Sequence, residues 1–130
     1  MNNLVTEIER IIIRRGQYSL EDGLVRKSQF EILCNGSGTY LSLDKNEKIV
    51  SEKKFSVPPE SFEKLCIRLI NIIHSFDRID VFYDAISEEV VLVFKNGTLT
   101  IPRGMGAKKK DVALIVQRFL NRYVLDQLKA

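Results

Sequence analysis

The segment that runs from Ile101 to Asp111, with the sequence IPRGMGAKKKD, contains the residues best suited to binding an anion. Glycines and then three lysines follow a predicted strand, and a predicted helix begins directly after them. Backbone N–H groups at a helix N-terminus converge on an anion, and neighbouring lysines add point charges. We therefore predict that an anion or an acidic partner binds at Arg103, Gly104, Gly106, Lys108, Lys109 and Lys110.

The alternative interpretation of this segment is a well-solvated loop that binds nothing. It lacks the G-x-x-x-x-G-K-[ST] spacing of a Walker A loop and the third glycine of a dinucleotide-binding loop. The positive end of a helix dipole disfavours neighbouring lysines, although Asp111 as the N-cap offsets part of that cost. Residues 103–130 nevertheless hold seven basic and two acidic side chains, and Arg118 and Arg122 extend the predicted basic surface by one helical turn.

A second candidate surface lies in the mildly acidic middle of the chain. Asp80, Phe82 and Asp84 alternate along one face of a predicted strand, and Glu88 follows in the next turn. We predict a protein contact surface at these four residues. The alternative is a strand edge that its charges keep soluble.

Metal binding has weak support in the sequence. On a single helix, the spacing of His74, Asp77, Asp80 and Asp84 would place all four on one face. A helix end and the start of a strand are predicted between His74 and Asp80, so we expect no metal site and no cofactor.

Catalysis has weak support as well. Cys34 and Cys66 have no CxxC partner, which excludes a zinc ribbon and a redox motif. A pairing of Cys34 with His74 would lack a third group to orient it. We expect no catalytic residue and a protein that is not an enzyme.

Hydrophobic periodicity predicts the elements that must position these residues. Apolar positions recur every 3.6 residues over 4–16, which predicts a first helix that ends at Gly16. Alternating residues predict strands over 29–34, 39–43 and 48–57, and Pro58-Pro59 opens a second helix. The second half predicts strands at 79–86, 90–95 and 98–101, with a type I′ hairpin turn at Asn96-Gly97, and a third helix from Asp111.

The chain has 130 residues and a net charge of +3, with 45% hydrophobic and 28% charged residues. These values predict one folded domain over residues 1–130. No apolar run approaches the ~20 residues of a membrane-spanning helix. Glu7 and Glu9 precede the first pair of adjacent arginines, the wrong charge order for a signal peptide, so we expect a cytoplasmic protein of a bacterium or phage.

The predicted fold class is α+β: an antiparallel sheet of two three-stranded meanders with helices on one face, in the order α-βββ-α-βββ-α. This order resembles that of the class I type III secretion chaperones, which are small dimers. Those chaperones are usually acidic, whereas this chain is basic. The resemblance covers element order alone.

Two functions are compatible with these residues. The first is a small non-catalytic module that binds one cognate protein, as an inhibitor, immunity protein or chaperone does, because charge-patterned surfaces confer specificity without chemistry. The alternative is a nucleic-acid- or anion-binding module that uses the C-terminal basic residues. Exposed aromatics for base stacking are missing from that surface, since Phe119 and Tyr123 fall on the apolar stripe of the predicted helix. No membrane partner is expected, and a homodimer stays open.

Overall fold

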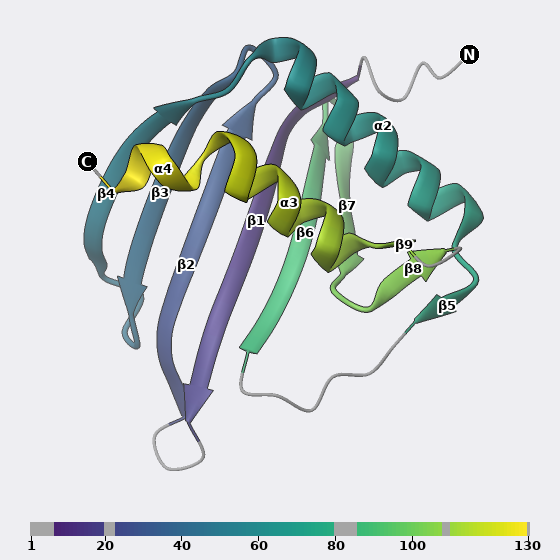
Figure 1. Cartoon of the computed structure of the whole chain (residues 1–130). Coiled ribbons are helices and arrows are strands. Elements are labelled where there is room, and N and C mark those ends of the chain that lie inside the picture. Colours follow the sequence, from purple (N-terminus) through teal and green to yellow (C-terminus); the bar gives the residue numbers. More distant parts are fainter. Residues whose placement is uncertain (1–6, 20–22, 80–85, 108–109, 130) are drawn as a thin grey trace.

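A computed structural model describes residues 7–19, 23–79, 86–107 and 110–129. Its largest element is an antiparallel sheet of six strands, with the strand order β4-β3-β2-β1-β6-β7 (Figure 1). These strands are β1 (Ile8–Ser19), β2 (Gly23–Leu33), β3 (Ser37–Asp44), β4 (Ile49–Ser56), β6 (Ile86–Phe94) and β7 (Gly97–Pro102). Because β1 pairs with both β2 and β6, the first strand in sequence lies at the centre of the sheet.

Three helices and a second, small sheet complete the described fold. The helices are α2 (Pro59–Ser75), α3 (Val112–Tyr123) and the short α4 (Leu125–Leu128). The small sheet has the order β5-β8-β9 and consists of β5 (Arg78–Ile79), β8 (Met105–Ala107) and β9 (Lys110–Asp111). It lies beside the end of α2 and the start of α3 (Figure 1).

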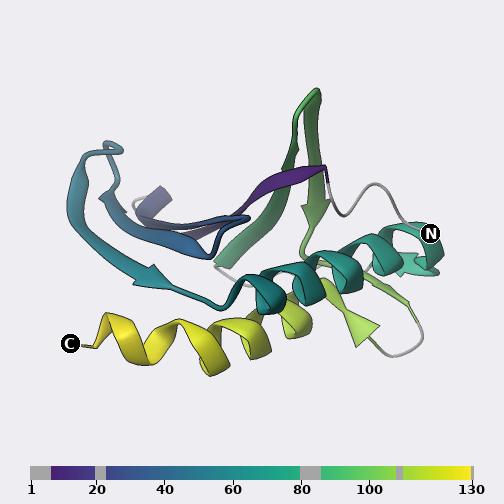
Figure 2. The same cartoon turned by 90° about the horizontal axis from the view of Figure 1, so that it is seen from above.

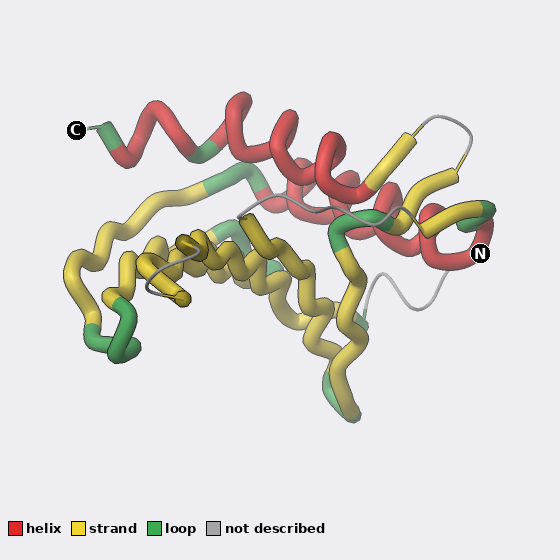
Figure 3. Tube along the Cα trace, turned by 90° about the horizontal axis from the view of Figure 1, so that it is seen from below, coloured by secondary structure: helices red, strands yellow, loops and turns green. Residues whose placement is uncertain are grey.

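The helices all lie on one side of the six-stranded sheet (Figures 2 and 3). Side chains of α2 and α3 form one continuous core with the sheet face beneath them. The largest fully buried side chains of this core include Ile11, Ile13, Ile32, Leu69, Ile70, Leu92, Ile101 and Leu120. Each such side chain contributes about 1.5–3 kcal/mol by leaving water. An α+β fold with a mostly antiparallel sheet is therefore confirmed.

The predicted first helix is wrong over residues 8–16, which belong to β1. Ile11, Ile12 and Ile13 are 0%, 7% and 0% exposed. Ile11 and Ile13 belong to the core under the helices, whereas Ile12 is outside that cluster and lies on the opposite sheet face. Burial on both faces yields an unbroken apolar run, and β-branched residues favour a strand over a helix. The resemblance in element order to the secretion chaperones, which begins with this helix, is lost with it.

The predicted second meander is found only in part. Most of its first strand, residues 80–85, lies outside the described residues, and the two described ends of that strand belong to different sheets: Ile79 pairs with Met105 in the small sheet, whereas Ile86 begins β6. The hairpin between β6 and β7 is confirmed, because Phe94 pairs with Gly97. The type I′ turn predicted at Asn96-Gly97 is wrong, since that turn requires positive φ at both central residues and neither Asn96 nor Gly97 has it.

The sheet face that no described helix covers carries its own ion-pair layer. Arg10 Nη1 lies 2.6 Å from Glu31 Oε2, and Arg14 Nη1 lies 3.3 Å from Glu89 Oε1. Arginine stems of this kind cover apolar surface while their charged ends stay in water. Ile12 is 7% exposed on this face, which no described helix covers.

Candidate functional site

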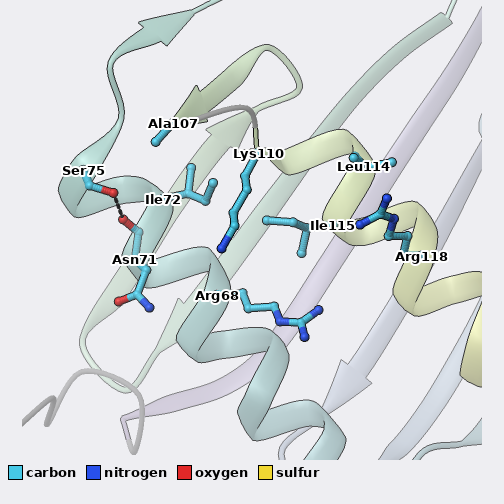
Figure 4. Close-up of a pocket in the computed structure, with 9 residues that line it drawn as sticks. All are labelled: Arg68, Asn71, Ile72, Ser75, Ala107, Lys110, Leu114, Ile115 and Arg118. Carbon is cyan, nitrogen blue, oxygen red and sulfur yellow. Dashed lines mark hydrogen bonds between the residues drawn. The ribbon is translucent and has the colours of Figure 1, made fainter.

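A groove of about 450 Å³ lies between α2 and α3 (Figure 4). We call it the basic groove. Residues of both helices and of the small sheet line it: Arg68, Asn71, Ile72 and Ser75 from α2, Leu114, Ile115 and Arg118 from α3, and Ala107 and Lys110 from β8 and β9.

Three cations from three elements meet in the basic groove. The Lys110 side chain extends between the helices with its ammonium toward Arg68, and Arg118 lies across from Arg68 on α3 (Figure 4). Within the described part of the chain, these three side chains form no ion pair and no hydrogen bond. The groove therefore carries a positive charge that no described residue neutralises.

The floor of the groove is apolar. Ile72, Ile115 and Ala107 are 3%, 9% and 4% exposed, and Leu114 at the rim is 41% exposed. The polar side chain of Asn71 lies at the edge, and the Ser75 hydroxyl donates to the Asn71 backbone carbonyl oxygen at 2.6 Å (Figure 4). Cations above an apolar floor fit a ligand that has both carboxylates and apolar side chains.

The small sheet fixes Lys110 at the start of α3. Ala107 pairs with Lys110 and Gly106 pairs with Asp111. A Cβ at Gly106 would lie 2.7 Å from the Lys110 carbonyl oxygen and 2.9 Å from Arg78 Nη2, so only glycine permits this close approach. The Leu114 N–H donates to Asp111 Oδ1 at 2.8 Å, which confirms the predicted N-cap.

The predicted basic residues are partly brought together. Lys110 and Arg118 line the basic groove. Gly106 does not line it but permits the close backbone approach to Lys110 just described. Lys108 and Lys109 lie outside the described residues. Arg103, Gly104 and Arg122 are described but do not line the groove; the Arg122 guanidinium lies over the Tyr123 ring, 5.4 Å from its centroid.

The predicted acidic surface lies mostly outside the described residues, since Asp80, Phe82 and Asp84 belong to the segment 80–85. Glu88 is described, and its side chain is 7% exposed. Its carboxylate forms an ion pair with Arg15, whose Nη2 also donates to Gln117 Oε1 of α3 at 2.7 Å. The pair of Glu88 and Arg15 therefore connects β6, β1 and α3 within the fold.

Arg68 is the groove residue that sequence reasoning missed. The positive charge of residues 103–130 directs attention to the C-terminus, whereas Arg68 belongs to the central helix. The spacing of Arg68, Asn71, Ile72 and Ser75 carries a usable signal, because residues three and four apart share one helix face. What the sequence does not show is that this face lies against α3.

The cysteines differ in their surroundings: Cys34 is exposed and Cys66 is buried. Burial, and secondly the charge of Glu63, raises the pKa of the Cys66 thiol to about 12. Among the residues described, no three His, Cys, Asp or Glu side chains cluster as metal ligands would. No described helix is long and apolar enough to span a membrane.

No protein-family model matches the chain, and no curated protein matches it either. The candidate function therefore depends on the groove itself.

Proposed function

We propose that this protein is a non-catalytic interaction module that binds an acidic, amphipathic segment of one partner protein in the basic groove. The observation that supports this proposal is the meeting of Arg68, Lys110 and Arg118 above an apolar floor, without a carboxylate partner among the described residues. Inhibitors, immunity proteins and chaperones are the kinds of protein that act by such binding alone.

Charge alone would not give useful affinity at this site. Ion pairs between exposed side chains contribute about 0.2–1 kcal/mol each, and salt screens them. Burial of apolar area contributes about 25 cal/mol per Å². A partner segment must therefore place an apolar side chain against Ile72 and Ile115 while its carboxylates reach the cations. The cations would set the association rate and the orientation of the segment.

The alternative is a nucleic acid, and the lining of the groove favours a protein. A phosphate backbone needs cations but gains nothing from the apolar floor formed by Ile72, Ile115 and Ala107. Single-stranded nucleic acids also use aromatic platforms, and none of the described residues that line the groove is aromatic.

The test compares two charge-reversed variants of the whole chain. Arg68→Glu/Arg118→Glu changes the groove, whereas Lys64→Glu/Arg122→Glu makes the same charge change on the same two helices outside it. A partner captured by the native chain is purified, and its Kd is measured against all three proteins. We expect at least about tenfold weaker binding for the groove variant and little change for the control.

Two results would overturn the proposal. Equal loss of binding in both variants would reveal unspecific attraction to a basic surface. Binding to oligonucleotides at ~0.15 M salt that only the groove variant loses would assign the groove to nucleic acid, with a log–log salt slope of about −0.9 per phosphate contacted.

A further inference from the structure

A second hollow, of about 410 Å³, lies between the sheet and α4, away from the basic groove. We call it the α4 hollow. Its sheet side consists of residues from β1 to β4, and its other side consists of two leucines of α4; the lining residues are Arg15, Ser28, Phe30, Tyr40, Ser51, Lys53, Leu125 and Leu128. The helices cross the sheet without reaching the far ends of β2, β3 and β4, which leaves this part of the face open (Figure 1).

The α4 hollow has aromatic and apolar walls. The rings of Phe30 and Tyr40 pack with their centroids 4.9 Å apart, and Phe30 is 3% exposed. Leu125 and Leu128 of α4 pack against the core from the other side. An apolar group of a ligand would therefore contact rings on one side and leucines on the other.

Three hydroxyl groups line the hollow and have no hydrogen-bond partner in the part of the chain that the structure describes. Among the described residues, none of the side chains of Ser28, Tyr40 and Ser51 makes a hydrogen bond. The sheet register explains why they gather. Ser28 and Ser51 both pair with Ser42 of β3, and Tyr40 lies two residues from Ser42 on the same strand face. A ligand oxygen in the hollow would find several donors at once.

The charges in the hollow leave one cation without a carboxylate. Arg15 is neutralised by Glu88 and is held by Gln117. Lys53 Nζ donates to the Leu128 carbonyl oxygen of α4, and no described carboxylate pairs with it. The described residues of the hollow thus carry a net charge of about +1, which favours a monoanion.

We propose that the α4 hollow binds a small organic carboxylate with an aromatic or short aliphatic body. The carboxylate pairs with Lys53 and accepts hydrogen bonds from Ser51 and Tyr40, while the body lies between Phe30 and the α4 leucines. The volume agrees with this class, because small-molecule sites usually measure ~300–1,000 Å³. A nucleotide or a larger polyanion would leave most of its charge unpaired here.

The test uses 4-phenylbutyrate as the probe and the neutral 4-phenylbutanol as its control. Binding to the whole chain is followed by ¹H–¹⁵N NMR. We expect saturable shifts in β4 and α4 with phenylbutyrate and at least about fivefold weaker binding of the alcohol. Lys53→Gln should weaken phenylbutyrate about tenfold, because a charge-assisted contact is lost.

Matched variants separate the site from general effects. Lys54→Gln removes a cation from the adjacent position on the other face of β4, where Lys54 Nζ donates to Thr39 Oγ1 at 3.0 Å, and it should bind the probe as the native chain does. Ser51→Leu should abolish binding by filling the hollow without a change in charge. The groove variant Arg68→Glu/Arg118→Glu should bind phenylbutyrate normally, so this proposal and the proposed function fail separately.

The proposal is overturned by any of three results. The first is the absence of saturable shifts up to about 10 mM phenylbutyrate, the weak end of useful affinity. The second is equal affinity for the acid and the alcohol. The third is unchanged binding in a folded Lys53→Gln or Ser51→Leu variant.

Discussion

The side-chain amide of Gln127 pairs with both backbone groups of Ser56, as a neighbouring strand would. The Ser56 N–H donates to Gln127 Oε1 at 3.0 Å, and Gln127 Nε2 donates to the Ser56 carbonyl oxygen at 2.7 Å. The two contacts attach α4 to β4, an edge strand of the large sheet. They also occupy one end of an edge that would otherwise offer free backbone groups.

Replacement of Gln127 should detach α4 without unfolding the sheet. Gln127→Ala removes both contacts with Ser56, each of which contributes about 0.5–1.5 kcal/mol. We expect amide hydrogen exchange in Leu125–Leu128 to become at least about tenfold faster while exchange in β1 stays unchanged. Asp126→Ala, on the same short helix, is the control. Unchanged exchange in α4 after Gln127→Ala would show that the leucine contacts alone hold it.

Glu88 and Glu89 are adjacent in sequence, but the ion pair of Glu88 is largely buried and that of Glu89 is exposed. The pair of Glu88 and Arg15 has side-chain exposures of 7% and 23%, whereas the pair of Glu89 and Arg14 has 42% and 40%. Glu88→Ala leaves a largely enclosed cation without its partner and should cost about 2 kcal/mol or more. Glu89→Ala should cost less than about 1 kcal/mol. Urea unfolding of both variants measures the difference, and equal costs would contradict the assignment.

Gly38, in β3, should tolerate alanine less well than Gly97, at the β6–β7 hairpin. A Cβ at Gly38 would lie 2.2 Å from the Phe55 ring, whereas a Cβ at Gly97 would meet nothing within 4 Å. Gly38→Ala must displace a buried ring and should cost about 1–3 kcal/mol. Gly97→Ala should change the free energy of unfolding by less than about 0.5 kcal/mol. A destabilised Gly97→Ala would contradict this account.

The two cysteines should react at very different rates. Only the thiolate attacks a disulfide reagent, and burial raises the pKa of Cys66 to about 12 while Cys34 is exposed. One thiol per chain should react with Ellman's reagent in native protein, and two in denaturant. Cys34→Ser should abolish the native reaction. Rapid reaction of two thiols without denaturant would contradict the burial of Cys66.

The same pKa predicts how stability changes with pH. The folded chain holds the Cys66 proton up to a pKa of about 12, whereas the ordinary value is 9.0, so the unfolded chain releases it first. The stabilisation is complete below the unfolded pKa and is lost as pH rises from there through the folded value. Unfolding free energies measured over this range should fall more steeply for the native chain than for Cys66→Ala. Equal slopes would exclude the contribution.

The sequence predicted correctly those elements whose starts or ends are marked by adjacent residues. The strands around the turn at residues 35–38, the helix opened by Pro58-Pro59 and the capped start of α3 all follow from adjacent residues. The prediction of a first helix failed because its apolar positions fit two patterns equally well. One is a helix with a 3.6-residue period, and the other is a strand that is buried on both faces. These positions are Leu4, Ile8, Ile11 and Ile12. Three consecutive isoleucines were the better guide, since β-branched side chains disfavour a helix.

The candidate site was only half predictable for a similar reason. Lys110 and Arg118 stand out in a basic C-terminal segment, and both line the groove. Arg68 becomes their neighbour only through the packing of α2 beside α3, a contact between residues far apart in sequence. Lys53 and Tyr40 show the same limit, because the sheet register and α4 create their hollow together.

The central position of β1 has a consequence for synthesis of the chain. β1 is complete once residue 19 is made, and β2 to β4 can pair beside it in order, but its other neighbour, β6, begins only at Ile86. At roughly 5–20 residues per second, a ribosome needs several seconds to supply that partner. During this interval the partial sheet exposes the edge of a strand rich in isoleucine, the kind of edge that recruits other chains into aggregates. We therefore expect the late pairing of β1 with β6 to be the step at which folding competes with aggregation.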